Sequence, residues 1–92
     1  MPKYTFYSDA GHGWLKVPMV EVISLGIAGR LSTYSYQHNG NVFLEEDCDM
    51  GIFVLAKTNI ENVSHWCKDN IKDVYQEHTP IRGYPHYQPR DH

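Results

Sequence analysis

The sequence predicts an α+β fold, with two β-hairpins that form a small antiparallel sheet and two or three helices packed on it. Three observations support this prediction. Asn39-Gly40 lies between two β-rich stretches, and Asn-Gly suits a type I′ turn because both central residues need positive φ. Residues 3–8 alternate aromatic and polar side chains, as a strand does. Residues 58–77 repeat apolar side chains at spacings of three and four, as an amphipathic helix does.

The first hairpin is expected to join a strand over residues 3–8 to a strand over residues 12–17. Residues 9–11 (Asp-Ala-Gly) have the composition of a turn. Pro18 fits the first position of a helix, where its missing N–H is not needed. This helix is expected to run through Leu25, with Gly26 in the left-handed conformation that closes many helices.

The second hairpin takes its register from the Asn39-Gly40 turn. The register pairs His38 with Asn41, Gln37 with Val42, Tyr36 with Phe43, Ser35 with Leu44 and Tyr34 with Glu45. One face then carries Tyr34, Tyr36, Phe43 and Glu45. We expect this aromatic face to be the core side, although Val42 and Leu44 make the opposite face a real competitor. If both faces are covered, the hairpin is central in the sheet.

An acidic run follows this hairpin. Asp47 or Asp49 is expected to cap a helix that ends at Lys57, because a carboxylate there accepts a free N–H of the first turn. A buried strand over residues 51–56 is the alternative. Glu45 and Glu46 should be solvated and project to opposite faces, which would put one of them beside Tyr34 and Tyr36.

A third helix is expected over residues 58–77. Thr58 and Glu61 match a capping box. The helix would end before Pro80. Residues 1–79 are therefore predicted to form a single compact domain. Residues 80–92 form a Pro/Tyr-rich extended tail, which either lies across the domain through Ile81, Tyr84 and Tyr87 or is mobile at its end.

The composition excludes several classes of protein. The chain has 92 residues and a formal net charge of −3, which disfavours nucleic-acid binding because that needs clustered Lys and Arg. No apolar stretch is long enough to span a membrane, and no signal peptide is visible. Cys48 and Cys67 match no zinc pattern, and we expect two free thiols in a reducing cytoplasm. We expect no cofactor and no metal. A homo-oligomer is compatible with the sequence.

The polar and aromatic residues of the two hairpins and the acidic run are the candidate binding residues. They are Asp9, His12, Trp14, Tyr34, Tyr36, Glu45, Glu46, Asp47 and Asp49. Each also has a structural interpretation: turn, cap, solvated surface or core, with the indole N–H of Trp14 satisfied. His plus carboxylates is a legitimate ligand set, but no established metal or nucleophile spacing is present. Cys48 lies among carboxylates, which raise a thiol pKa and make a poor nucleophile.

Several spaced motifs within residues 4–56 resemble a group of short uncharacterised proteins carried by bacteriophages, prophages and plasmids. The motifs are Y-S-D-x-G-H-G-W-L-x-V-P from Tyr7, L-G-I from Leu25, S-x-Y-S-Y from Ser32 and L-E-E-D-C-D from Leu44. The resemblance implies a bacterial host cytoplasm and a phage or mobile-element gene. It implies no catalytic residues, because no activity is established for the group.

These observations lead to one expected function and two alternatives. We expect a non-enzymatic accessory protein that binds a host protein, of the host-takeover or anti-defence type. The first alternative is a small metal-dependent hydrolase that uses His12 with Asp9 and the acidic residues 45–49, which requires His12 to meet those carboxylates in the fold. The second is a nucleic-acid binder, which the acidic net charge disfavours.

Overall fold

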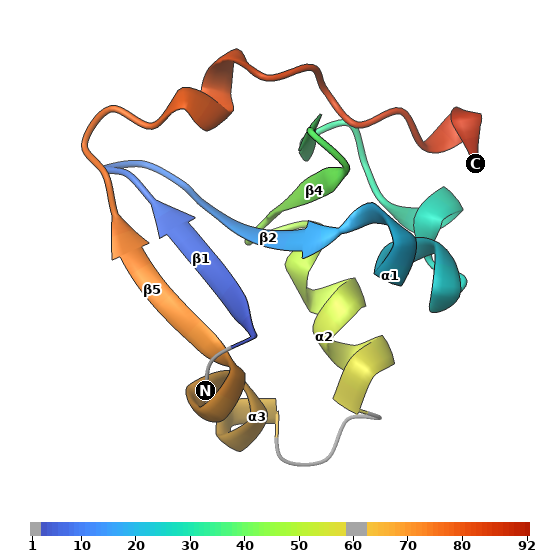
Figure 1. The fold of residues 1–92 in the computed structure, drawn as a ribbon, viewed down its shortest axis with the longest axis horizontal. Helices are drawn as coiled ribbons and strands as arrows, with labels where there is room; N and C mark the ends of the chain where they lie inside the picture. Colours follow the sequence, from blue (N-terminus) through green and yellow to red (C-terminus); the bar gives the residue numbers. More distant parts are fainter. Residues whose placement is uncertain (1–2, 59–62) are drawn as a thin grey trace.

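The computed structural model describes residues 3–58 and 63–92, and it has the α+β fold that the sequence predicts (Figure 1). The strands are β1 (Tyr4–Ser8), β2 (Gly13–Pro18), β3 (Tyr36–His38), β4 (Asn41–Glu45) and β5 (Ile71–Tyr75). The helices are α1 (Met19–Ser24), α2 (Met50–Thr58) and α3 (Val63–Asn70), with short 3-10 turns at Ala28–Arg30, Pro80–Gly83 and Pro89–Asp91. The strands form one sheet in the order β3-β4-β2-β1-β5. No helix in the described ranges is long and apolar enough to cross a membrane.

The first hairpin, β1–β2, forms as predicted. Its turn is closed by the Asp9 carboxylate, which accepts hydrogen bonds from the N–H groups of Gly11 and His12 at 3.0 and 2.9 Å. Pro18 was predicted to be the first residue of the helix. It is instead the last residue of β2, and α1 begins at the next residue, Met19. Gly26 has a φ of 73° and follows the end of α1, as expected for a glycine at this position.

The second hairpin also forms, although its first strand is shorter than predicted. Asn39 and Gly40 have φ values of 51° and 79°, as a type I′ turn requires. The three pairs nearest the turn have the predicted register. The predicted pairs of Ser35 and Tyr34 do not continue the ladder, because the Ser35 hydroxyl accepts the N–H of Glu45 at 3.0 Å in place of a backbone carbonyl.

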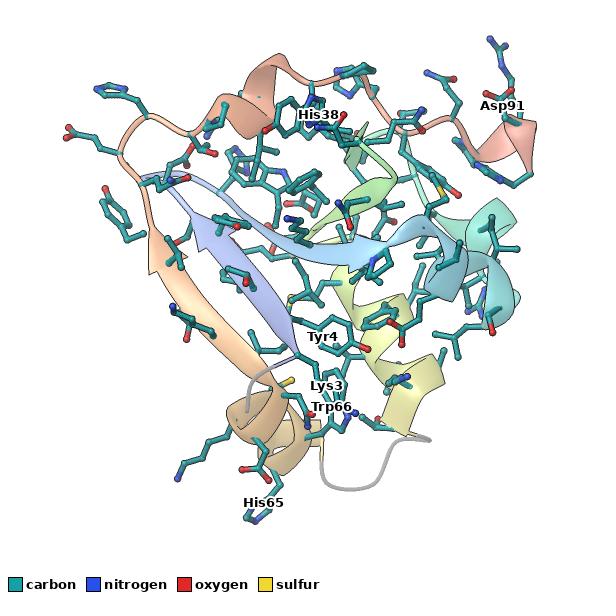
Figure 2. All side chains as sticks on the ribbon, in the orientation of Figure 1. Lys3, Tyr4, His38, His65, Trp66 and Asp91 are labelled. Carbon is teal, nitrogen blue, oxygen red and sulfur yellow. The ribbon has the colours of Figure 1, made fainter. Side chains whose placement is uncertain are left out.

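The larger core lies on the face of the second hairpin opposite the aromatic one, so the predicted core side was wrong. Val42 and Leu44 are fully buried there with residues of β2 and the helices. The core also includes Tyr4, whose ring contacts Phe53 of α2 and Trp66 of α3 at centroid distances of 5.4 and 5.6 Å (Figure 2). The aromatic face is covered separately by the C-terminal segment. β4 is therefore internal, while β3 lies at the edge of the sheet.

Helix α2 forms where a helix was favoured over a strand, but within the described residues neither the Asp47 nor the Asp49 side chain accepts a hydrogen bond from it. Asp49 immediately precedes α2 and is 1% exposed. Its carboxylate accepts hydrogen bonds from the N–H and the hydroxyl of Ser32 and from the hydroxyl of Ser35. Only the backbone carbonyl of Asp49 accepts from α2, through Ile52 and Phe53. Asp49 therefore joins α2 to the segment before β3.

The predicted third helix was wrong over its second half. Helix α3 ends at Asn70, and the chain continues as β5, which pairs in parallel with β1. Ile71 lies opposite Tyr4 in this ladder and packs against the larger core. Thr58 is the last residue of α2, and the rest of the predicted capping box lies outside the described residues.

Residues 79–92 form a strap across the sheet and reach the 3-10 turn at Ala28–Arg30 (Figure 1). Ile81 and Tyr87 are buried, and the Tyr87 hydroxyl donates to the carbonyl of Ala28 at 2.7 Å. The strap also bonds along the edge strand, since the N–H of Gln37 donates to the Pro85 carbonyl at 2.8 Å. Of the two alternatives for the tail, the one that lies across the domain is observed.

Candidate functional site

The sheet has two differently covered faces. The helices and the larger core cover one face. The strand register places Trp14, Lys16, Tyr36, Phe43 and Glu45 on the other. Trp14, Phe43 and Ile81 form a small buried cluster there, under the strap. Because the strap covers only part of this face, a hollow remains on each side of the cluster.

One of these hollows, of about 340 Å³, contains most of the predicted site residues, and we call it the acidic hollow. Its lining residues are His12, Trp14, Tyr34, Tyr36, Glu45, Asp47, Cys48 and Arg82. Six of these eight were predicted binding residues. Arg82 was not a predicted binding residue, because it lies in the tail, far along the chain from the hairpins. Glu46 and Asp49 do not line this hollow.

Asp9 acts on the hollow through Arg82. The Arg82 guanidinium donates from Nε and Nη2 to Asp9 Oδ2 and Oδ1 at 2.6 and 3.0 Å. This paired hydrogen bond holds the pKa of Asp9 well below its usual range and raises the pKa of Arg82. Arg82 also lies over the Trp14 ring, with its Cζ 5.3 Å from the ring centroid. The positive charge of Arg82 is thus fixed in place and compensated.

Glu45 is buried rather than solvated, which corrects the sequence-based expectation. It is 8% exposed, and its Oε2 accepts the N–H groups of Asp47 and Cys48, each at 2.9 Å. Its Oε1 lies 3.9 Å from Nδ1 of His12. Partial desolvation and the Glu45 carboxylate raise the pKa of the Cys48 thiol, as expected from the acidic surroundings. Glu45 therefore shapes the turn after β4 and presents one oxygen toward His12.

Trp14 is a core residue, as expected. A hydrogen-bond partner for its indole N–H was also expected, but none is found among the described residues. The side chain is 2% exposed, and its Nε1 is buried without a hydrogen-bond partner among the described residues. Most buried polar groups in proteins are paired. The His12 and Tyr36 rings and the Arg82 guanidinium pack near the indole, but no hydrogen bond joins Nε1 to any of them.

The two tyrosines of the aromatic face have different environments. Tyr36 packs: its ring stacks on His86 at a centroid distance of 4.6 Å and meets the ring of Trp14 edge-on at 6.2 Å. Tyr34 lies in the turn before β3 and is 67% exposed. Glu45 lines the same hollow as Tyr34 and Tyr36, whereas Glu46 does not.

The two remaining predicted residues lie elsewhere. Glu46 is exposed and lines a separate hollow with Met50 and Lys68, on the helical side of the sheet. Asp49 is the buried partner of Ser32 and Ser35. Across the described parts of the chain, no group of three or more His, Cys, Asp and Glu side chains is placed to hold a metal ion.

Scans against models of protein families, curated protein sequences and solved structures each find no match. The acidic hollow is therefore interpreted from its own geometry. It combines an exposed tyrosine, a partly exposed histidine and two carboxylates, with its one arginine already paired to Asp9. Such a hollow can accept a hydrogen-bond donor or a positive charge.

Proposed function

We propose that this chain is a non-enzymatic accessory protein of the phage or mobile-element type that binds a host protein. We further propose that the acidic hollow receives a basic side chain of that partner. The motif resemblance supports the setting. The support for the binding mode is the exposure of Tyr34 next to carboxylates, because exposed tyrosines at the edge of a pocket are frequent anchors of protein interfaces.

The charge balance of the hollow favours a cationic group. Arg82 and Asp9 compensate each other, which leaves the carboxylates of Glu45 and Asp47. A Lys or Arg side chain placed between these carboxylates and the Tyr34 ring would gain both an ion pair and a cation–π contact, worth about 0.5–1 kcal/mol at an exposed site. An acidic group would be repelled at the same position.

Affinity capture from bacterial lysate with hollow and control variants tests this proposal. Tyr34→Ala and Asp47→Asn remove the exposed ring and one carboxylate of the hollow. Tyr75→Ala and Glu46→Gln are matched controls, since Tyr75 is 64% exposed on β5 and Glu46 is exposed outside the hollow. We expect a protein that the wild type and both controls retain and that both hollow variants lose.

Three outcomes of this capture contradict the proposal. If the hollow variants retain the captured protein as well as the wild type does, the interface lies outside the acidic hollow. Repeated failure of a folded bait to enrich any protein would argue against a protein partner. Retention that disappears after nuclease treatment, together with steep weakening by salt, would identify a nucleic-acid binder instead.

The second candidate function is the small metal-dependent hydrolase that uses His12 with Asp9 and residues 45–49. The approach of His12 to Glu45 favours it, whereas no group of described side chains is placed to hold its metal. A histidine next to a carboxylate is a common acid–base arrangement, and the 3.9 Å separation meets the requirement set by the sequence. Activity toward a panel of ester, phosphodiester and peptide substrates that is lost in His12→Gln would support this function. Full activity in His12→Gln would exclude a catalytic role for this histidine.

A further inference from the structure

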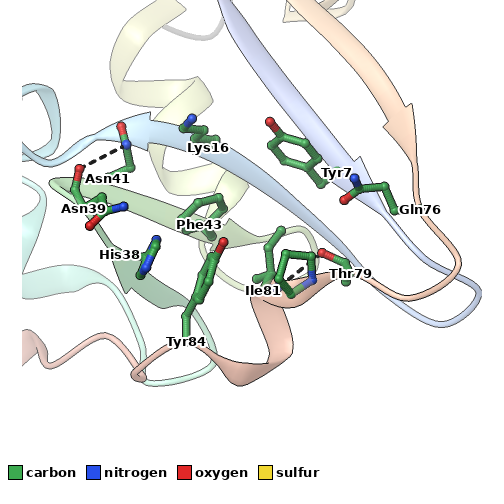
Figure 3. A pocket seen from close by; sticks show the side chains of 11 residues that line it. Tyr7, Lys16, His38, Asn39, Asn41, Phe43, Gln76, Thr79, Ile81 and Tyr84 are labelled. Carbon is green, nitrogen blue, oxygen red and sulfur yellow. Dashed lines mark hydrogen bonds between the residues drawn. The ribbon is translucent and has the colours of Figure 1, made fainter.

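The second hollow beside the strap, of about 310 Å³, has the opposite electrostatic character, and we call it the lysine hollow (Figure 3). Lys16 of β2 lies on its rim, and Phe43, Ile81 and Tyr84 form its floor. Lys16 is placed there by strand alternation, because it pairs with Phe43 and therefore shares its face of the sheet. Lys16 was not among the predicted binding residues.

Among the described residues that line this hollow, Lys16 is the only Lys or Arg, and none is Asp or Glu. Lys16 also makes no ion pair with any residue that the structure describes. In this respect it differs from Lys57, which is paired with Glu21, and from Arg82, which is paired with Asp9. The hollow therefore presents an uncompensated positive charge on a chain whose formal net charge is −3.

Neutral polar groups surround this charge. The Tyr7 side chain points into the hollow from β1, and the amides of Asn41 and Gln76 lie on the rim at opposite sides (Figure 3). Hydroxyl and amide groups can donate to an anion without adding charge of their own. The Asn41 amide has only a long bond of 3.4 Å, to the carbonyl of Asn39, so it has capacity to donate to a ligand.

The floor of the hollow is a set of packed rings. Tyr84 stacks on His38 with a centroid distance of 4.0 Å and an interplanar angle of 6°. Its other neighbour is Phe43, at 5.2 Å, and Phe43 in turn lies 6.4 Å from Tyr7. These rings line the same hollow as Lys16. An apolar lining with a few placed polar groups is typical of small-molecule sites.

We propose that the lysine hollow binds a small organic anion. A carboxylate or phosphate group of the ligand pairs with Lys16 and the neighbouring hydroxyl and amide donors, and its apolar or aromatic body lies against Phe43 and Tyr84. A single cation suits one anionic group and not a nucleic-acid backbone, which requires several. This site is separate from the acidic hollow, so it stands or falls independently of the proposed function.

A titration of the intact ¹⁵N-labelled chain with three phenyl compounds tests this site. Benzoate and phenyl phosphate carry the two candidate anions, and benzamide is the neutral analogue of benzoate. At low ionic strength we expect benzoate or phenyl phosphate to shift the amide signals of Lys16, Phe43 and Tyr84, with benzamide at least about tenfold weaker, since one charge-assisted contact is commonly worth a factor of ten. The tighter of the two anions identifies the class of ligand.

Variants of Lys16 separate the charge from the fold. Lys16→Gln should weaken anion binding about tenfold, while Lys16→Arg should retain it. Lys72→Gln is the matched control, because Lys72 is an exposed lysine on β5, opposite Thr5 in the ladder and outside the hollow. An unchanged amide spectrum of each variant away from the substitution verifies the fold.

Several results would overturn this inference. One is equal binding of benzamide and benzoate, and another is unaltered binding by a folded Lys16→Gln. Shifts confined to the acidic hollow would also overturn it. So would the absence of any shift with either anion at about 10 mM, because even a millimolar site would be occupied at that concentration.

Discussion

Replacing Asp49 by Ala tests the connection between α2 and the segment before β3. The buried Asp49 carboxylate is the acceptor for the N–H of Ser32 at 2.9 and 3.0 Å, for the Ser32 hydroxyl at 2.8 Å and for the Ser35 hydroxyl. Ser35 is fully buried and Ser32 is partly buried. Asp49→Ala would therefore remove the acceptor from donors that water reaches poorly.

The expected loss of stability follows from the donors that would have no acceptor. A buried donor that loses its acceptor costs about 1–3 kcal/mol. The Ser35 hydroxyl and the Ser32 N–H together give an expected loss of about 2–6 kcal/mol in the free energy of unfolding. A simple helix cap would cost only about 0.5–2 kcal/mol. Glu46→Ala, an exposed change three residues away, should stay within about 0.5 kcal/mol.

Urea denaturation of a double-mutant cycle separates the two explanations. Asp49→Ala, Ser35→Ala and the double variant should show a coupling of about 0.5–3 kcal/mol, because the two side chains share a hydrogen bond. A cap on α2 predicts no coupling to Ser35. Additive losses, within error, would refute the assignment of Asp49 as a tertiary connection.

Three further predictions concern the strap and the first hairpin. Tyr87→Phe should lower the free energy of unfolding by about 1–3 kcal/mol in a urea titration, because a buried carbonyl loses its donor. Arg82 lowers the pKa of Asp9, so the ion pair stabilises the folded state at neutral pH. This stabilisation is lost as the pH falls through the pKa of Asp9 in the folded state, so Arg82→Gln should flatten the acid side of a Tm–pH profile. Gly13→Ala would place Cβ 2.2 Å from Cζ of Phe6, costing about 1–3 kcal/mol, and Phe6→Leu should recover part of this in melting experiments.

Turns and caps that depend on one or two residues were predictable from the sequence. Asn39-Gly40 specifies its turn because few other residue pairs tolerate positive φ at both positions, and the turn then sets the register of the pairs beside it. Gly26 ends α1 for a similar backbone reason. The first hairpin followed from the alternation of its strands, whereas α2 formed without the acidic side-chain cap on which its prediction rested. These features have local causes, so the sequence displays them directly.

The candidate site was predictable in its members but not in its arrangement. His12, Tyr34 and Glu45 stood out as polar or aromatic residues near turns, and the fold brings them to one hollow. Arg82, which lines the same hollow, is 73 residues from its partner Asp9, and no local pattern indicates that pairing. The burial of Asp49 also depends on contacts 14 and 17 residues away, which a capping rule cannot anticipate.

Residues 71–75 show most clearly what only the tertiary structure decided. Ile71 and Val74 continue the apolar spacing of α3, so the sequence pattern predicts a longer helix. The chain instead forms β5, because β1 offers a parallel partner whose ladder satisfies the backbone and packs the half-buried Ile71 against the larger core. The burial of the aromatic face was also decided by the tertiary structure, because the strap that covers it comes from the other end of the chain. Sequence patterns report short-range preferences, whereas pairing and burial are decided by residues far along the chain that the folded protein brings into contact.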